Sequence, residues 1–116
     1  MNHRGRAGED RAANFLQTQG LILVARNYGC RFGEIDLIAQ DLTTLVFVEV
    51  RWRRQASPHS LLETIHPHKQ RRLWWTAQNF LAQYPHPPPC RFDIILVTGT
   101  QCQNLAWYPA VVLEPC

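Results

Sequence analysis

Hydrophobic residues recur at helical spacing near the N-terminus of the chain. Between Glu9 and Gln19, the apolar positions repeat as they do along one face of a helix: Ala12, Ala13, Phe15 and Leu16. Gly20 follows at the position where a helix commonly ends in a left-handed residue. The pattern therefore predicts a first helix over residues 9–19.

Three short apolar segments come next, and their length suits strands better than helices. Leu21–Ala25 is followed by the turn-forming residues 27–29, and Glu34–Gln40 and Leu45–Trp52 come after it. The last segment is rich in β-branched residues, and around Glu49 it is apolar on both faces, as expected of a central strand: Leu45, Val46, Phe47, Val48 and Val50. The three segments predict a meander of neighbouring strands.

A second helix is predicted in the second half of the chain. Ser57–Pro58 interrupts the strands, a short helical stretch is expected at residues 61–64, and Pro67 suits a first helical position. An apolar stripe at 3.6-residue spacing marks the long helix that follows: Leu73, Trp74, Ala77, Phe80, Leu81 and Tyr84. The prolines from residue 85 to residue 89 end this helix.

Two more strands complete the pattern. Phe92–Val97 has the continuous apolar character of a buried strand, and Leu105–Leu113 is expected at an edge because Pro109 cannot donate a backbone hydrogen bond. The order of elements predicts an α/β fold, with a mixed sheet flanked by helices. A length of 116 residues with 46% hydrophobic and 18% charged residues fits a single globular domain over residues 1–116.

Charge and cysteine content narrow the class of protein. The net charge is +3, and eleven of the twelve basic residues are arginines, which suit phosphate contacts, although genomic base composition can produce the same bias. The four cysteines form no C-x-x-C pair, and the chain begins without the apolar stretch of a signal peptide. No apolar run is long enough to span a membrane. We therefore expect a cytoplasmic protein with reduced thiols and no membrane partner.

The hairpin between the second and third predicted strands brings acidic residues together. If its loop centres between Leu42 and Thr43, paired residue numbers sum to 85, so Asp36 faces Glu49 and Glu34 faces Arg51. Two carboxylates at that spacing repel unless a proton or cation lies between them, and two such groups with waters suit Mg²⁺ or Mn²⁺. The alternative is a solvated face on which Arg51 and Glu34 form a surface ion pair.

The hairpin carries two motifs that resemble those of a known family. Gly-Glu-Ile-Asp-Leu-Ile at residues 33–38 and Val-Phe-Val-Glu-Val-Arg-Trp-Arg at residues 46–53 resemble the central signature of the YraN-like family of uncharacterised bacterial proteins. Gly8-Glu9, Arg26-Asn27, Lys69 and Arg91-Phe92-Asp93 agree with the same pattern, so the resemblance spans residues 5–98.

That family resembles the restriction-endonuclease-like fold, with its αβββαβ core and PD-(D/E)xK metal site, and is similar in layout to Holliday junction resolvases. The resemblance implies that Asp36 is the first metal-binding acid and Glu49 the second, and that Glu9 on the first helix completes the site. The position of the motif lysine holds Arg51, which can hold phosphate charge but cannot give up its proton. Lys69 is the candidate to replace that lysine.

Further residues are candidates for contacts with nucleic acid. The basic residues after the hairpin and in the long helix fit a phosphate-binding rim, with a solvated basic face as the alternative: Arg53, Arg54, Lys69, Arg71 and Arg72. Trp52 and Trp75 are open to base stacking, whereas Trp74 is expected in the core. Asp93 is expected to form a local ion pair with Arg91.

Together these features predict a metal-dependent nuclease that hydrolyses phosphodiester bonds in structured or branched DNA with Mg²⁺ or Mn²⁺. Glu9, Asp36, Glu49, Arg51 and Lys69 are the candidate catalytic residues. Two alternatives stay open: a non-catalytic nucleic-acid-binding module with a degenerate nuclease site, and a structural partner in a larger complex. A homodimer is also open, because two-fold dimers are the commonest oligomers.

Overall fold

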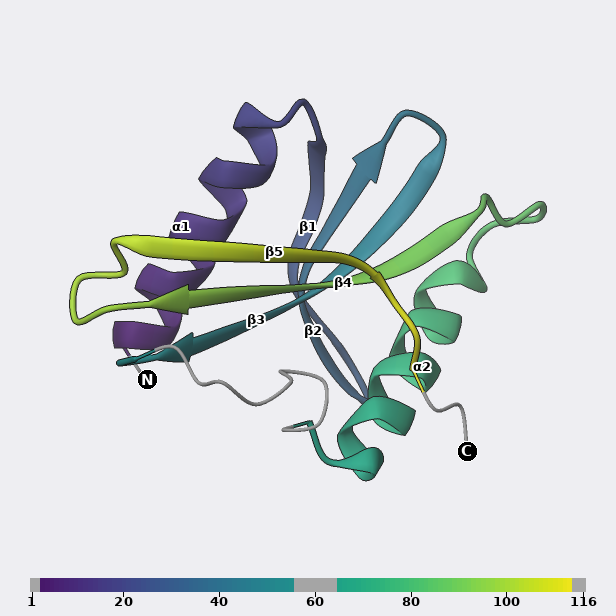
Figure 1. Ribbon diagram of the computed structural model, residues 1–116. Coiled ribbons are helices and arrows are strands. Elements are labelled where there is room, and N and C mark those ends of the chain that lie inside the picture. The colour runs from purple at the N-terminus through teal and green to yellow at the C-terminus, as the bar shows by residue number, and fades with distance from the viewer. Residues whose placement is uncertain (1–2, 56–64, 114–116) are drawn as a thin grey trace.

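A computed structural model describes residues 3–55 and 65–113. Five strands form one sheet in the order β1-β2-β3-β4-β5, and two helices cover it (Figure 1). The elements are α1 (His3–Thr18), β1 (Ile22–Cys30), β2 (Gly33–Asp41), β3 (Thr44–Arg53), α2 (Pro67–Leu81), β4 (Cys90–Thr98) and β5 (Asn104–Val111). Because β3 pairs with β4 in parallel and the other neighbours are antiparallel, the predicted mixed α/β sheet is confirmed.

The two helices bury opposite faces of the sheet. Ala12, Ala13 and Leu16 of α1 pack against Leu37 and other small or branched residues of the central strands. A separate cluster forms under α2, where its apolar stripe covers Ile35, Ile38, Leu45 and Phe47. The sheet is thus the middle of three layers, and both faces of β2 and β3 are buried.

Helix α1 starts at His3 rather than at the predicted Glu9. Its first turns contain few apolar residues, so hydrophobic spacing does not mark them. The end of the helix is confirmed: Gly20 has φ +91°, and the N–H groups of Gly20 and Leu21 bond back to the carbonyls of Gln17 and Leu16. These paired bonds form a Schellman motif, which ends the helix and turns the chain into β1.

Strand β1 is longer than its apolar run. The prediction that residues 27–29 interrupt it is wrong, because Arg26 still pairs with Leu37 and Tyr28 with Ile35. Asn27 has φ 52°, a left-handed conformation that asparagine tolerates better than most residues. The strand therefore contains a local irregularity at Asn27 instead of ending there.

The predicted register of the β2–β3 hairpin is confirmed over its described pairs. Pairing runs from Asp41 with Thr44 to Leu37 with Val48, so the paired residue numbers sum to 85. Leu42 and Thr43 form a two-residue turn, in which Leu42 has φ 56° and is 89% exposed. The hairpin fixes which side chains of the two strands lie near one another.

Helix α2 begins at Pro67, as expected, and His66 caps it by accepting a hydrogen bond from the N–H of His68. Trp74 was expected in the core but is only half-buried. The helix ends at Leu81, so Tyr84 of the predicted apolar stripe lies outside it. The expected helical stretch at residues 61–64 lies outside the described residues. β5 lies at the edge of the sheet, as Pro109 predicts.

Cys30, Cys90 and Cys102 are free thiols. Within the described part of the chain, neither helix combines the length and apolar character that crossing a membrane requires.

Candidate metal centre

Asp36 lies where the alternation of β2 breaks. Ile35 and Ile38 belong to the cluster under α2, whereas Leu37 packs under α1, so residues 35 and 37 face opposite sides of the sheet. In a regular strand they would share a face. The Asp36 carboxylate instead reaches toward β3, where its Oδ2 accepts the N–H of Val50 at 2.8 Å. The side chain of Asp36 thus continues the contact with β3 beyond the last described backbone pair.

Glu49 is buried under α2 and is 5% exposed. Its Oε2 lies 2.8 Å from Nζ of Lys69 and 3.5 Å from Nη1 of Arg51. The ion pair described for Arg51 is thus with Glu49, and the alternative of a surface ion pair with Glu34 is not found among the described residues. The described β2–β3 pairs stop at Leu37 with Val48, so the expected facing of Glu34 and Arg51 is not among them.

The two acids come together as predicted. The carboxyl group of Asp36 lies within hydrogen-bonding reach of Glu49. Burial of Asp36 and the neighbouring Glu49 charge together raise the pKa of Asp36 to about 8, despite the hydrogen bond from Val50. Asp36 therefore favours its protonated form at neutral pH, and a cation bound at this place would favour the carboxylate instead.

Glu9 lines the same hollow, of about 580 Å³, as Asp36, Glu49 and Lys69. Helix α1 approaches β3 closely at Gly8, where an added Cβ would lie 3.9 Å from the side chains of Val50 and Trp52. Burial raises the pKa of Glu9, opposed by its hydrogen bond with Asn27 and by Arg26, whose Nη2 lies 3.8 Å from Oε1.

The donor set is small but chemically suitable. Among residues 3–55 and 65–113, no three His, Cys, Asp or Glu side chains lie close enough together to hold a metal ion. The Asp36–Glu49 pair alone provides two carboxylates. This fits Mg²⁺, which keeps several waters and is commonly held by one or two protein carboxylates.

Arg51 and Lys69 reach Glu49 from different elements. Arg51 extends from β3 itself, and its buried Nε has no hydrogen-bond partner. Lys69 extends from the first turn of α2 and is about half exposed. The sequence could not place Lys69, and the fold brings it to the position where a lysine would serve the paired acids.

The basic rim is only partly assembled around this centre. Arg53 and Arg54 line the same hollow as the acids, and Lys69 lies between it and a second hollow. Arg72 borders that second hollow, whereas Arg71 contacts His68 on its own helix. Four of the five predicted basic residues therefore border one or both of the hollows that contain Asp36.

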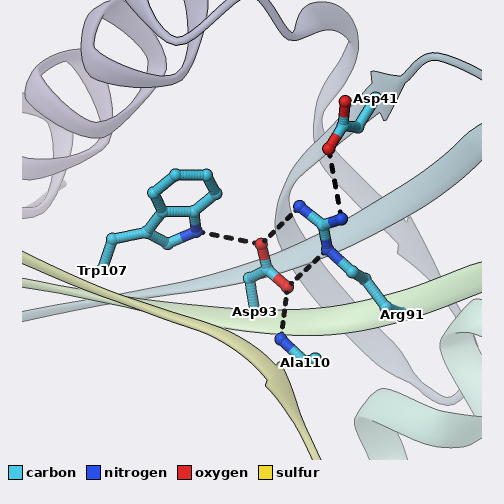
Figure 2. Close-up of polar contacts among 5 residues, drawn as sticks. All are labelled: Asp41, Arg91, Asp93, Trp107 and Ala110. Atoms are coloured by element: carbon cyan, nitrogen blue, oxygen red, sulfur yellow. Dashed lines mark hydrogen bonds and ion pairs between the residues drawn. The ribbon is translucent and has the colours of Figure 1, made fainter.

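Among the described residues, one acid besides Glu49 is buried: Asp93 of β4, whose contacts are drawn in Figure 2. Its expected ion pair with Arg91 is confirmed, with Nε of Arg91 3.1 Å from Oδ1. The indole N–H of Trp107 and the backbone N–H of Ala110 also donate to it, each at 2.9 Å. Arg91 in turn reaches Asp41 at 3.2 Å. The carboxylate of Asp93 is thus fully engaged in joining β4 to β5.

Comparison with known proteins places the chain in a family. Residues 8–97 match the family described as Uncharacterised protein family UPF0102. A UPF0102 protein of Alcanivorax borkumensis is 55% identical over 93 residues, covering 78% of this chain and 74% of that protein. A UPF0102 protein of Dichelobacter nodosus is 48% identical over 111 residues, covering 94% and 88%. The chain therefore belongs to the UPF0102 family, the YraN-like family that its hairpin motifs resemble.

Proposed function

We propose that this protein is a metal-dependent nuclease that hydrolyses phosphodiester bonds in structured or branched DNA. The observation that carries the proposal is the pair of neighbouring carboxyl groups on adjacent strands: Glu49, buried beside Lys69, and Asp36, partly buried next to it. An acid with a raised pKa that lies next to a second acid in a hollow is a candidate for a functional site.

Asp36 and Glu49 would hold Mg²⁺ or Mn²⁺ in this proposal, with Glu9 lining the same hollow. The bound ion would activate a water molecule and neutralise charge on the phosphate under attack. A cation also removes the repulsion between the two carboxylates, so the site favours an occupant of that charge.

Lys69 takes the part of the motif lysine. Its Nζ already lies 2.8 Å from Glu49, and its half-exposed side chain can move toward a bound phosphate. Unlike the guanidinium of Arg51, an ammonium group can lose its proton when its surroundings change. Arg51 then contributes charge, and Arg53 and Arg54 contact the phosphates that flank the cleaved bond.

The fold agrees with this assignment. The element order αβββαβ, with the acids on the second and third strands, is the order expected of the restriction-endonuclease-like core. The likeness of the YraN-like family to junction resolvases supports branched DNA as the substrate to test first.

The test combines metal binding with cleavage. Calorimetric titration of Mg²⁺ and Mn²⁺ should show binding that Asp36→Ala abolishes, together with metal-dependent cleavage of single-stranded, duplex or branched DNA. Asp41→Ala is the matched control, because Asp41 is an acid at the other end of the same strand. Lys69→Gln should lower the cleavage rate about 100-fold or more, as removal of one charge-stabilising group commonly does.

Binding of DNA without cleavage of any substrate, in the wild type as in Asp36→Ala, would contradict the nuclease proposal. That result would support the non-catalytic binding module, with Arg51 as the mark of a degenerate site. Absence of both binding and cleavage would support a structural partner.

A further inference from the structure

An aromatic cluster lies beside the candidate metal centre, where the β1–β2 turn meets α2. The rings of Phe32 and Trp75 stack with centroids 5.8 Å apart and an interplanar angle of 29°. Trp74 meets Trp75 edge to face at 4.8 Å. We refer to Phe32, Trp74 and Trp75 as the aromatic platform.

The platform is held in place by contacts between the turn and the helix. Nε of Arg72 donates to the carbonyl of Phe32 at 3.2 Å. Gly33 has φ +147°, a backbone conformation that residues with a side chain rarely adopt, and it lies against Arg72 and Thr76 of α2. The guanidinium of Arg31 lies 4.7 Å from the centre of the Phe32 ring. These contacts fix the turn against the helix.

Trp75 is 43% exposed, although it stacks on one ring and touches another. A tryptophan that served only the core would be buried more completely, because the indole ring carries a large apolar area. The indole of Trp75 is thus held between two aromatic neighbours while a large part of it contacts water.

The platform is linked to the metal centre through Gly33 and Arg72. A hollow of about 200 Å³ is lined by Asp36 and Lys69 of that centre and by Gly33 and Arg72, which contact or adjoin Phe32. Glu34 lies on the same hollow. The cations along this path, Arg31, Arg72 and Lys69, complement the negative charge of a phosphate backbone.

We propose that the aromatic platform binds an unpaired base of a nucleic acid whose phosphate backbone passes Arg72 and Lys69 to the metal centre. The proposal rests on the proposed nuclease function and specifies its substrate class: nucleic acid with a single-stranded segment next to the cleaved bond. Bases in a duplex are already stacked on one another, so an aromatic side chain on the protein surface favours unpaired ones.

The test measures binding without metal, so that it does not depend on cleavage. Fluorescence anisotropy in EDTA compares an oligothymidine of about twelve nucleotides with an abasic deoxyribose-phosphate chain of the same length. The wild type should prefer oligothymidine. Trp75→Ala should weaken oligothymidine binding about 5- to 100-fold, the usual effect of removing one stacking ring, and should leave abasic-chain binding unchanged.

Two further variants act as controls. Trp75→Phe keeps an aromatic ring and should retain most of the preference. Tyr108→Ala removes a ring of nearly equal exposure, 44%, from β5 and should change neither affinity. Circular dichroism of each variant verifies folding. If the alanine variant does not fold, Trp75→Leu, which keeps an apolar side chain without a ring, provides the measurement and should lose the preference for oligothymidine.

Equal binding of the two oligonucleotides by the wild type would overturn the inference, as would a preference that survives Trp75→Ala. Failure to bind either one would overturn it too. None of these results concerns metal-dependent cleavage, which the Asp36→Ala experiment decides separately.

Discussion

Asp36 and Asp93 are both aspartates on central strands of one sheet, yet their surroundings differ. Asp93 is 1% exposed and accepts hydrogen bonds from Arg91, Trp107 and Ala110. Asp36 receives the N–H of Val50, while its nearest ionisable neighbour, Glu49, is another acid. Asp93 is thus surrounded by hydrogen-bond donors, whereas Asp36 lies next to a second acid.

This difference separates a structural acid from the acid of the candidate site. The bonds to Asp93 span the irregular pairing of β4 with β5, between Phe92 and Ile94, so its charge stabilises the fold as it stands. The cations described at the candidate site, Lys69 and Arg51, pair with Glu49 rather than with Asp36. The comparison suggests that incomplete compensation, rather than burial alone, marks the candidate site.

The largest effect on stability is expected at Asp93. Asp93→Asn should lower the free energy of unfolding by about 3 kcal/mol, because Arg91 loses its buried charged partner. The N–H groups of the new side-chain amide would also face hydrogen-bond donors instead of acceptors. Chemical denaturation measures the loss. Adding Mg²⁺ should not reverse it, and an unchanged free energy would show that Asp93 is dispensable to the sheet.

Replacing Asp36 should raise the free energy of unfolding, by less than the loss expected at Asp93. Its pKa of about 8 in the folded protein exceeds the ordinary value of 3.8, so the folded state binds more protons between these values. Stability of the metal-free protein should therefore be greatest near the ordinary value and fall as pH rises toward 8. Asp36→Asn keeps an oxygen for Val50 and removes this dependence.

The measurement is the difference between wild type and Asp36→Asn in the free energy of unfolding, in EDTA. At pH 8 the variant should be more stable by on the order of 2 kcal/mol, and at pH 5 the difference should be much smaller. A difference that does not change with pH would mean that Asp36 titrates normally.

The smallest effect on stability is expected from Arg51→Lys. Glu49 keeps its 2.8 Å contact with Lys69, and the substitution removes a buried Nε that has no acceptor. The change should be below about 1 kcal/mol. If Lys69 acts as the motif lysine, the cleavage rate should also change less than about tenfold. A much larger increase in the cleavage rate would show that residue 51, and not Lys69, takes the role of the motif lysine.

Much of the fold could be predicted because hydrophobic spacing and turn residues act locally. The meander, the hairpin register and the edge position of β5 all follow from such signals. The start of α1 could not be found, because its first turns carry glycine and charged residues instead of an apolar stripe. The continuation of β1 past Asn27 likewise depends on pairing with β2.

For the candidate site, the predicted hairpin register placed Asp36 near Glu49, but it could not predict the orientation of the Asp36 side chain. That depends on the break in alternation between Ile35 and Leu37, which only packing on both faces reveals. The contact of Lys69 with Glu49 depends on where α2 crosses the sheet, so no local pattern contains it. The contact of Asn27 with Glu9 was missed for the same reason.

The parallel pairing of β3 with β4 also bears on the order in which the molecule folds. The hairpin that carries Asp36 and Glu49 closes through a two-residue turn, whereas β4 must wait for the chain that includes α2 to cross the sheet. Local contacts of this kind form faster than distant ones. We therefore expect Asp36 and Glu49 to meet during folding before α2 brings Lys69 to Glu49.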